Sequence, residues 1–147
     1  MNINIRLFTL SDYPDLFDLW NSLPGFKQGL RSMDDSEEGI ARFLKRNPKS
    51  CFVAEENGKI IGGILAGHDG RRGYIYHALV HPDYQKKGIG KLLADSACEA
   101  LKAEGITKAG MLVFATNEQG NAFWESHGWQ SRPDLVYRNK SLDDNNL

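Results

Sequence analysis

Three lysines and two glycines fall within one short segment, Gln85–Lys91, which reads Gln-Lys-Lys-Gly-Ile-Gly-Lys. An apolar, β-branched run from Tyr74 to Val80 precedes this segment, and a helical pattern of apolar residues begins within it. A glycine-containing loop between a strand and a helix directs several unpaired backbone N–H groups to one point, where the helix dipole also favours negative charge. These residue types and their spacing predict an anion-binding site for phosphate groups.

Two common phosphate-binding loops do not match this segment. A Walker loop requires Ser or Thr directly after its lysine as a ligand for magnesium, whereas Leu92 follows Lys91 here. A dinucleotide-binding loop requires a third glycine, and Leu93 stands at that position. A nucleotide-binding switch is therefore an unfavourable interpretation of the segment.

The segment resembles the Gln/Arg-x-x-Gly-x-Gly/Ala motif of the GCN5-related N-acetyltransferases (GNAT), matched here by Gln85, Gly88 and Gly90. In that family the N–H groups of the loop hold the pyrophosphate of acetyl-coenzyme A (acetyl-CoA). A second segment, Asn117–Trp129, resembles the other signature of the family, Asn-x-x-Ala-x-x-Phe-Tyr-Glu-x-x-Gly-Phe. Both motifs occur in the family's order, and the likeness covers nearly the whole chain. The resemblance implies a small bacterial N-acetyltransferase with acetyl-CoA as donor.

The rest of the chain predicts the elements that position these motifs. Hydrophobic periodicity predicts strands at residues 2–8, 51–55, 59–68, 74–80, 108–115 and 135–142, with helices opening at Tyr13, after Ser36, after Gly88 and at Asn117. Their order, β-α-α-β-β-β-α-β-α-β, is that of the GNAT fold. The resemblance therefore implies an α/β architecture with a mixed, twisted central sheet of six to seven strands and helices on both faces.

The chain is expected to form one domain, residues 1–142, followed by a polar tail, residues 143–147. Between the first two helices, the stretch Phe26–Met33 mixes aromatic, basic and flexible residues. In relatives the corresponding loop covers the acceptor site, so this stretch is a candidate for specificity. A surface connection between two helices explains it equally well.

The resemblance also assigns residues to acetyl-CoA. In the family, two adjacent strands splay apart and the pantetheine arm of the donor lies in the gap. By position, the strand that ends at Val80 would contact pantetheine through its backbone, and one of its N–H groups would polarise the thioester carbonyl. The expected donor-binding residues are Ala78, Leu79, Val80, Gln85, Lys86, Lys87, Gly88, Ile89, Gly90, Lys91, Asn117 and Trp124.

Trp124 departs from the family pattern, because many members have a tyrosine there whose hydroxyl protonates the leaving thiolate. An indole N–H cannot serve as that acid, so Trp124 is expected mainly to pack. A thiol has a pKa of about 8.5, which makes a thiolate a tolerable leaving group near neutral pH. Tyr137, on the expected last strand, is the replacement acid that we favour, with Tyr74 and Tyr76 as further candidates.

A base is needed as well, because an alkylammonium acceptor with a pKa of about 10 must lose a proton before it attacks. His77 titrates in the useful range and lies on the strand that leads to the phosphate loop. The face of the sheet on which His77 lies depends on one residue of register. The alternative to a role as base is a histidine packed under a helix. Glu55 is a further carboxylate near a strand end.

Composition excludes several other functions. The net charge of −1 over 147 residues gives no electrostatic footprint for nucleic acid. No apolar run approaches the roughly 20 residues of a membrane span, the start of the chain lacks the apolar core of a signal peptide, and a cytoplasmic location is expected. Cys51, Cys98 and the histidines lack metal-site spacing, so no metal is expected.

The expected partner is a primary amine of a small molecule or a peptide. Many relatives pair as homodimers, and no feature of this sequence decides that point. Two alternative functions stay open. One is a non-catalytic sensor that binds acyl-CoA, which Trp124 motivates, and the other is a transferase for another acyl group or for a hydroxyl acceptor.

Overall fold

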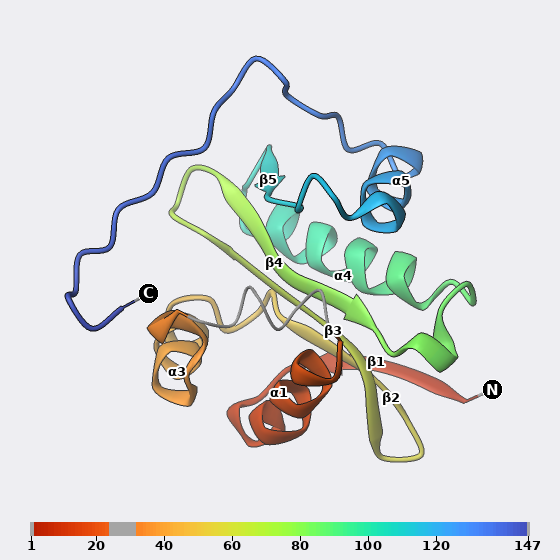
Figure 1. Cartoon of the computed structure of the whole chain (residues 1–147). Helices are drawn as coiled ribbons and strands as arrows, with labels where there is room; N and C mark the ends of the chain where they lie inside the picture. The colour runs from red at the N-terminus through yellow and green to blue at the C-terminus, as the bar shows by residue number, and fades with distance from the viewer. Residues whose placement is uncertain (1, 24–31, 147) are drawn as a thin grey trace.

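The computed structural model describes residues 2–23 and 32–146, and within them it contains one five-stranded sheet (Figure 1). In spatial order the strands are β1 (Ile3–Leu7), β2 (Phe52–Glu56), β3 (Lys59–His68), β4 (Gly73–Val80) and β5 (Ala109–Met111). Neighbouring strands are antiparallel except β4 and β5, which are parallel. Most of the stretch 26–33, which the sequence links to the acceptor, lies outside the described residues.

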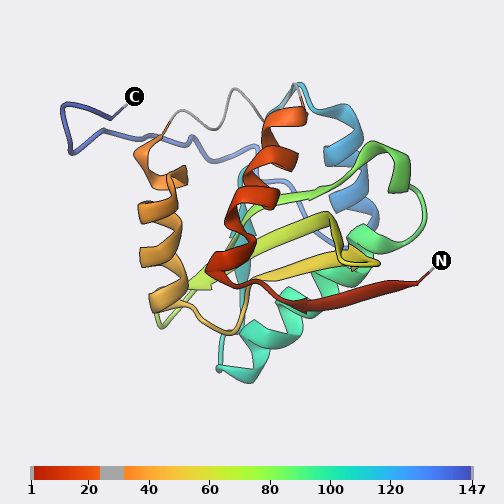
Figure 2. The same cartoon turned by 90° about the horizontal axis from the view of Figure 1, so that it is seen from below.

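Helices cover both faces of the sheet, as the sequence predicts (Figures 1 and 2). They are α1 (Tyr13–Ser22), α3 (Glu37–Arg46), α4 (Ile89–Ala103) and α5 (Glu118–Ser126). The sheet face under α1 and α3, here called the α1/α3 face, has its own buried core around Leu16 and Trp20. The opposite α4/α5 face has a second core around Ile61 and Leu93. Two separate cores hold the sheet rigid between them.

Local sequence signals explain several boundaries. Asn57 and Gly58 have φ values of 50° and 82°, the left-handed geometry of a two-residue hairpin turn, and they join β2 to β3 as predicted. Ser36 Oγ accepts a hydrogen bond of 3.1 Å from Gly39 N and so caps the N-terminus of α3. Basic residues in the last turn of α3 suit the negative end of the helix dipole.

A β-bulge interrupts β4 at His77. Gly63 pairs with Leu79 and Leu65 pairs with Tyr76, so two β4 residues, 77 and 78, stand opposite one β3 residue. His77 has a φ of 46°, which is uncommon for a side chain other than glycine. Because of this extra residue, Tyr76 and His77 both face α1 and α3, where their rings meet those of Phe43 and Trp20. The bulge thus settles which face His77 occupies.

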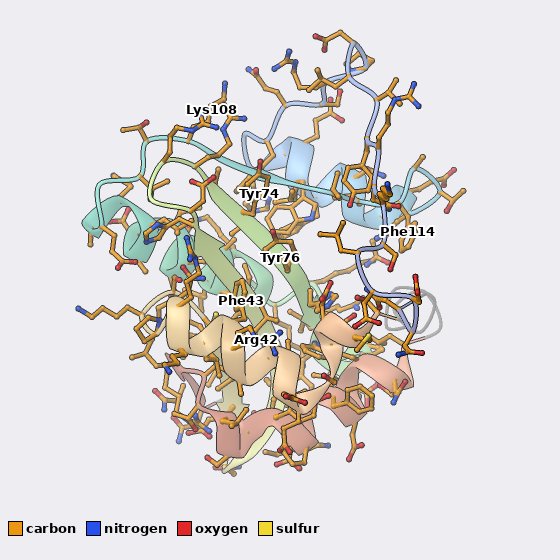
Figure 3. All side chains as sticks on the ribbon, turned by 90° about the vertical axis from the view of Figure 1, so that its left-hand side faces the viewer. Arg42, Phe43, Tyr74, Tyr76, Lys108 and Phe114 are labelled. Carbon is orange, nitrogen blue, oxygen red and sulfur yellow. The ribbon has the colours of Figure 1, made fainter. Side chains whose placement is uncertain are left out.

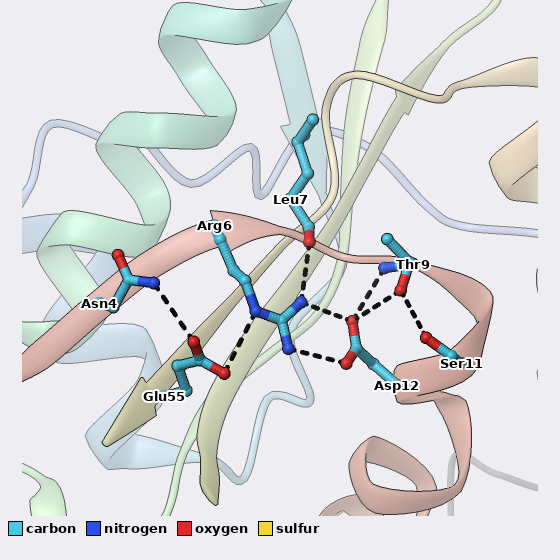
Figure 4. Close-up of polar contacts among 7 residues, drawn as sticks. All are labelled: Asn4, Arg6, Leu7, Thr9, Ser11, Asp12 and Glu55. Carbon is cyan, nitrogen blue, oxygen red and sulfur yellow. Dashed lines mark hydrogen bonds and ion pairs between the residues drawn. The ribbon is translucent and has the colours of Figure 1, made fainter. Parts of the chain in front are cut away.

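A polar network at the start of the chain holds β1 against the entry to α1 (Figure 4). The Arg6 guanidinium donates two hydrogen bonds of 2.8 Å to Asp12, and its Nε lies 3.2 Å from Glu55 Oε2. Asn4 Nδ2 donates to the other oxygen of Glu55 at 3.2 Å. Glu55, which the sequence offered as a reactive carboxylate, is therefore a structural partner of β1.

One strand prediction is wrong and another is too long, and the sheet has five described strands instead of six to seven. The predicted strand 108–115 is hydrogen-bonded only over Ala109–Met111, because β4 and β5 diverge beyond that point. The predicted strand 135–142 is irregular and crosses the molecule as a long arc (Figure 1). Its residues Leu135, Val136 and Tyr137 are 60%, 76% and 64% exposed, so no neighbouring strand or core offsets the cost of ordering them.

Candidate active site

A short 3₁₀ turn, Pro82–Tyr84, connects the end of β4 to the glycine-containing loop. His81 Nδ1 accepts a hydrogen bond of 3.1 Å from Asp83 N and so caps this turn. The hydroxyl of Tyr84 donates to Glu56 Oε1 at 2.8 Å, which ties the turn to the end of β2. These two hydrogen bonds fix the turn from which the loop begins.

Gln85, the first residue of the loop motif, is engaged within the protein. Its Nε2 donates to the backbone oxygen of Val80 at 3.0 Å, and its Oε1 accepts from Gln119 Nε2 at 3.1 Å. Its side chain thus connects the end of β4 to the first turn of α5. These contacts give Gln85 a role in shaping the loop.

The loop ends in a helix N-terminus that is open for a ligand. Gly88 has a φ of 84° and forms the N-cap of α4, and no described side chain caps this end by a hydrogen bond. The first intrahelical bond runs from Leu92 N to Gly88 O at 3.1 Å, so the N–H groups of Ile89, Gly90 and Lys91 have no partner within the helix. A Cβ at Gly88 would meet nothing within 4 Å. An open helix N-terminus of this kind is able to bind an anion, and the anion site stays a prediction.

The loop lysines differ in what they contact. Lys86 and Lys87 are exposed, and Lys87 Nζ lies 5.5 Å from the ring centroid of Tyr84. Lys91 Nζ pairs with Asp95 Oδ2 at 2.7 Å along the surface of α4. Positive charge available to a bound anion therefore comes mainly from Lys86 and Lys87.

The second glycine of the loop, Gly90, has a packing role that the sequence did not reveal. A Cβ there would lie 3.3 Å from two ring atoms of Phe123, so Gly90 allows α5 to approach α4 closely. Asn117 Oδ1 accepts a hydrogen bond of 2.9 Å from Gly120 N and caps α5. The second motif thus docks its helix against the loop of the first.

Trp124 packs, as its indole suggests. Its ring meets the ring of Trp129 edge-on, with centroids 5.5 Å apart and an interplanar angle of 72°. Both rings are half-buried against the core of the α4/α5 face. Trp124 lies on the helix that borders the loop, and its side chain brings no acid to the site.

A gap opens between β4 and β5 beside the loop. The two strands pair only at Gly73–Ala109, Tyr74–Gly110 and Ile75–Met111. From Tyr76 to Val80, β4 keeps its β3 neighbour on one edge, while its other edge has no strand partner among the described residues. The divergence expected between these strands is present, and the open edge runs directly toward the loop.

An imidazole–carboxylate pair lies on the α1/α3 face at the bulge. His77 Nε2 is 2.5 Å from Asp35 Oδ1, with side-chain exposures of 21% and 9%. The ring of Trp20 lies 4.8 Å from the imidazole, and Tyr13 donates its hydroxyl to the backbone oxygen of Asp35 at 2.6 Å. The sequence indicated His77 but not Asp35, because nothing in a linear pattern joins residues that far apart.

The tyrosines named from the sequence gather near one another. Tyr137 is not on a strand, yet it lies close enough to Tyr76 to affect the pKa of the Tyr76 phenol. Burial raises the pKa of Tyr76, and the phenols of Tyr74 and Tyr137 and the carboxylate of Asp34 raise it further. The Tyr76 hydroxyl is therefore protonated at neutral pH and available as a hydrogen-bond donor.

Two further features concern the described residues as a whole. Among residues 2–23 and 32–146, no group of three or more His, Cys, Asp or Glu side chains is placed to hold a metal ion. None of the helices found there has the length and apolar character needed to cross a membrane.

The profile of the acetyltransferase (GNAT) family matches residues 13–129, which include both motifs and the bulged strand. The chain belongs to this family. An acetyltransferase of Sodalis glossinidius is 31% identical over 140 residues, covering 95% of this chain and 96% of the relative. An acetyltransferase of Pectobacterium atrosepticum is 30% identical over 142 residues, covering 97% and 98%. Membership of the GNAT family identifies the chain as an N-acetyltransferase enzyme.

Solved structures share the fold of this GNAT acetyltransferase. An aminoglycoside acetyltransferase from an uncultured soil metagenomic sample, in complex with sisomicin, superposes with a TM-score of 0.76 at 21% identity, covering 96% of this chain and 97% of that one. A PaiA N-acetyltransferase from Thermoplasma acidophilum, in complex with coenzyme A, superposes with a TM-score of 0.74 at 19% identity, covering 99% and 96%. At these identities the likeness establishes the fold alone.

Proposed function

We propose that this GNAT acetyltransferase uses acetyl-CoA as donor and transfers the acetyl group directly to a primary amine of a small molecule or a peptide. The observation that carries the proposal is the open edge of β4, which the turn and loop of residues 81–88 connect to the open N-terminus of α4. A β4 edge that no described strand pairs with, followed by a helix N-terminus that can hold an anion, suits a ligand with an amide-containing arm and a phosphorylated end. Acetyl-CoA has both, and it supplies a thioester that an amine can attack.

The loop would hold the phosphates. The N–H groups of the first turn of α4 and the flexible cations of Lys86 and Lys87 all serve anion binding. Gln85 and Gly90 act by shaping the loop and by admitting α5. Residues proposed to bind or support the donor are Ala78, Leu79, Val80, Gln85, Lys86, Lys87, Gly88, Ile89, Gly90, Lys91, Asn117 and Trp124.

The backbone of β4 would orient the reacting group. Ala78, Leu79 and Val80 lie on the open edge just after the bulge. An N–H group there, aimed at the thioester carbonyl, stabilises the negative charge that develops on its oxygen during attack. Fixing donor and acceptor side by side is a large catalytic contribution in itself.

His77 is proposed as the base, with Asp35 as the residue that orients it. An ammonium acceptor must lose a proton, and the paired imidazole stands one residue before Ala78 on the α1/α3 face. A carboxylate partner stabilises the imidazolium that forms when the proton arrives. The proton thus moves from the acceptor to the His77–Asp35 pair.

Proton delivery to the leaving sulfur is less demanding. A coenzyme A thiolate leaves without full protonation near neutral pH, because thiol pKa values are about 8.5. If a side chain protonates the leaving sulfur, Tyr137 is the proposed proton donor, and Tyr76 offers a protonated hydroxyl nearby. Trp124 supports α5 and does not take part in proton transfer.

The range of acceptors named for proteins of the same fold supports an amine as acceptor. One neighbour is an aminoglycoside acetyltransferase, and another is a ribosomal-protein-alanine N-acetyltransferase of Brucella melitensis, with a TM-score of 0.71 at 21% identity, covering 96% of this chain and 100% of that one. The first name concerns a small molecule and the second the N-acetylation of a protein, so both kinds of acceptor are included in the proposal.

The test is acetyl-CoA-dependent thiol release across a panel of primary amines, amino acids and short peptides, scanned over pH. Release that depends on the amine, with an acetylated amine found by mass spectrometry, supports direct transfer. Saturable acetyl-CoA binding without release across the whole panel would contradict it and favour the sensor function. Faster release with longer acyl donors would instead assign the chain to another acyl group.

A further inference from the structure

A pocket of about 260 Å³ lies between α3, the C-terminal end of β3 and the first half of β4. Its lining residues are Phe43, Arg46, Asn47, Gly67, His68, Asp69, Tyr74 and Tyr76. None of these residues belongs to the phosphate loop or to the proposed base. The pocket therefore lies apart from the proposed donor-binding residues, on the α1/α3 face.

Aromatic rings form one wall of the pocket. The rings of Phe43 and Tyr76 meet edge-on with centroids 5.8 Å apart, and those of Tyr74 and Tyr76 are 6.3 Å apart. Figure 3 shows the three side chains between β4 and α3. Tyr74 and Tyr76 keep 40% and 45% of their surface exposed. A wall of this kind suits a flat, apolar ligand group.

A buried amide lies in the floor of the pocket. Asn47 is 3% exposed, and its Oδ1 accepts a hydrogen bond of 3.0 Å from His68 N. Its Nδ2 donates to none of the described residues, and a Cβ at Gly67 would lie 2.7 Å from it. Glycine at that position leaves this donor accessible, so the floor offers an N–H group to an acceptor atom of a ligand.

The part of the lining formed by Arg46 and Asn47 favours an anionic ligand group. Arg46 has no ion pair with a carboxylate in the described part of the chain. Asp69, the one lining carboxylate, accepts hydrogen bonds of 2.8 Å from the backbone N–H groups of Arg71 and Arg72. His68 Nε2 is 3.3 Å from Glu104. The guanidinium of Arg46 and Nδ2 of Asn47 are thus the polar groups of the lining that a ligand would pair with.

The opposite end of the pocket meets the transfer site. Tyr76 lines the pocket and is also the first β4 residue without a partner on the β5 side. The next residue of β4 is His77, whose imidazole pairs with Asp35. One end of the pocket thus lies next to the open edge of β4 and the other carries the Arg46 guanidinium, with aromatic rings between them.

We infer that this pocket binds the acceptor, and that the acceptor is an amine whose flat apolar body ends in a carboxylate. The inference rests on the proposed N-acetyltransferase function and specifies its substrate class. The ammonium group would lie beside Tyr76, at the end of the pocket next to the His77–Asp35 pair. The carboxylate would accept hydrogen bonds from Arg46 and Asn47, in the geometry that guanidinium and carboxylate groups favour.

A matched pair of acceptors tests the inference. 4-(Aminomethyl)benzoate and 4-(aminomethyl)benzamide share one shape and one primary amine and differ in the charge at the far end. We expect kcat/KM for the benzoate to exceed that for the benzamide by at least about 10-fold, since charge-assisted hydrogen bonds are the strong ones. Equal values would overturn the assignment of a carboxylate-bearing substrate.

Three variants locate the effect. Arg46→Gln should remove most of the preference while leaving kcat/KM for the benzamide within about 3-fold of the parent value. Asn47→Asp keeps the oxygen that accepts from His68 N but replaces the free donor by a repelling charge, so it should also remove the preference. Lys45→Gln, one residue away in the last turn of α3 and outside the pocket lining, is the matched control and should retain it.

Calorimetry separates failure of the inference from failure of the proposed function. The protein loaded with coenzyme A is titrated with each probe. If neither amine is acetylated but the benzoate still binds at least about 10-fold more tightly than the benzamide, and Arg46→Gln abolishes that difference, the pocket assignment stands and the transfer proposal falls. A preference that survives both Arg46→Gln and Asn47→Asp would overturn the pocket assignment, whatever the activity.

Discussion

The imidazole Nε2 of His77 lies 2.5 Å from Oδ1 of Asp35, across 42 residues of chain. The contact depends on the bulge in β4, because the left-handed backbone at His77 places its ring on the α1/α3 face next to Tyr76. Such a backbone costs roughly 1–3 kcal/mol and persists where the surroundings compensate it. Asp35 and the ring of Trp20 supply that support, and the result is an oriented imidazole beside the open strand edge.

If His77 accepts the proton of the acceptor, His77→Gln should lower kcat/KM for the amine by about 10²-fold or more, as loss of a general base does. Asp35→Asn should lower it by about 10-fold, because the imidazole stays but loses its orienting charge. Thiol release at saturating acetyl-CoA, scanned over pH, is the measurement, and both variants should change the pH profile. His127→Gln, at the exposed C-terminus of α5, is the control.

A structural role alone would give a different pattern. Both variants would then unfold at lower urea concentration and lose acetyl-CoA affinity along with activity, while the pH profile of the remaining activity stayed that of the parent protein. Full activity in His77→Gln would contradict the assignment of a base directly.

Lys86 and Lys87 should contribute to donor binding through their charge. Replacing both by Gln is expected to raise KM for acetyl-CoA about 3–10-fold, with little change in kcat, because exposed charges contribute modestly and are screened by salt. The effect should shrink as ionic strength rises from 0.02 to 0.5 M, about the range over which the Debye length falls from tens to a few ångström. Lys102→Gln, at the far end of α4, should leave KM unchanged. An unchanged KM in the double variant would remove these lysines from the site.

Much of the scaffold was predictable because it follows from local patterns. The bounds of β3 match the prediction at Lys59 and His68, and the Asn57-Gly58 turn forms where its dipeptide indicates. The open helix N-terminus at Gly88 follows from a glycine placed between a strand and a helical pattern. Each of these features is decided by residues within a few positions of one another.

Other features required tertiary information. Alternating residues at 135–142 indicate a strand, but a strand needs a neighbour, and none of the described strands pairs with it. The bulge at His77 has no glycine or proline to announce it. Gly90 reads as a ligand-approach glycine, and only the packing of α5 shows that Phe123 occupies that space. Asp35 became a candidate once the fold brought it to His77.

Trp124 should tolerate replacement by another aromatic residue without loss of chemistry. Because its ring packs against Trp129 and takes no part in proton transfer, Trp124→Phe is expected to keep kcat within about 3-fold. Trp124→Ala should lower the free energy of unfolding by about 2–4 kcal/mol, somewhat less than for a fully buried tryptophan. Urea denaturation and thiol release measure the two effects. A 100-fold loss of kcat in a stably folded Trp124→Phe would show that the indole has a catalytic task.

The Arg6–Asp12 contact should make stability depend on pH. Hydrogen bonds from Arg6 hold the pKa of Asp12 below its ordinary value of about 3.9, so the contact stabilises the folded protein fully above that value and is lost as pH falls through the lowered folded-state pKa. Asp12→Asn is expected to lower the free energy of unfolding by about 1–3 kcal/mol at pH 7, and the difference should shrink below about pH 4. Urea denaturation from pH 3 to pH 7 measures it, with Asp18→Asn on the exposed side of α1 as the control. A difference between parent and Asp12→Asn that stays constant over this range would show that the charge of Asp12 does not contribute.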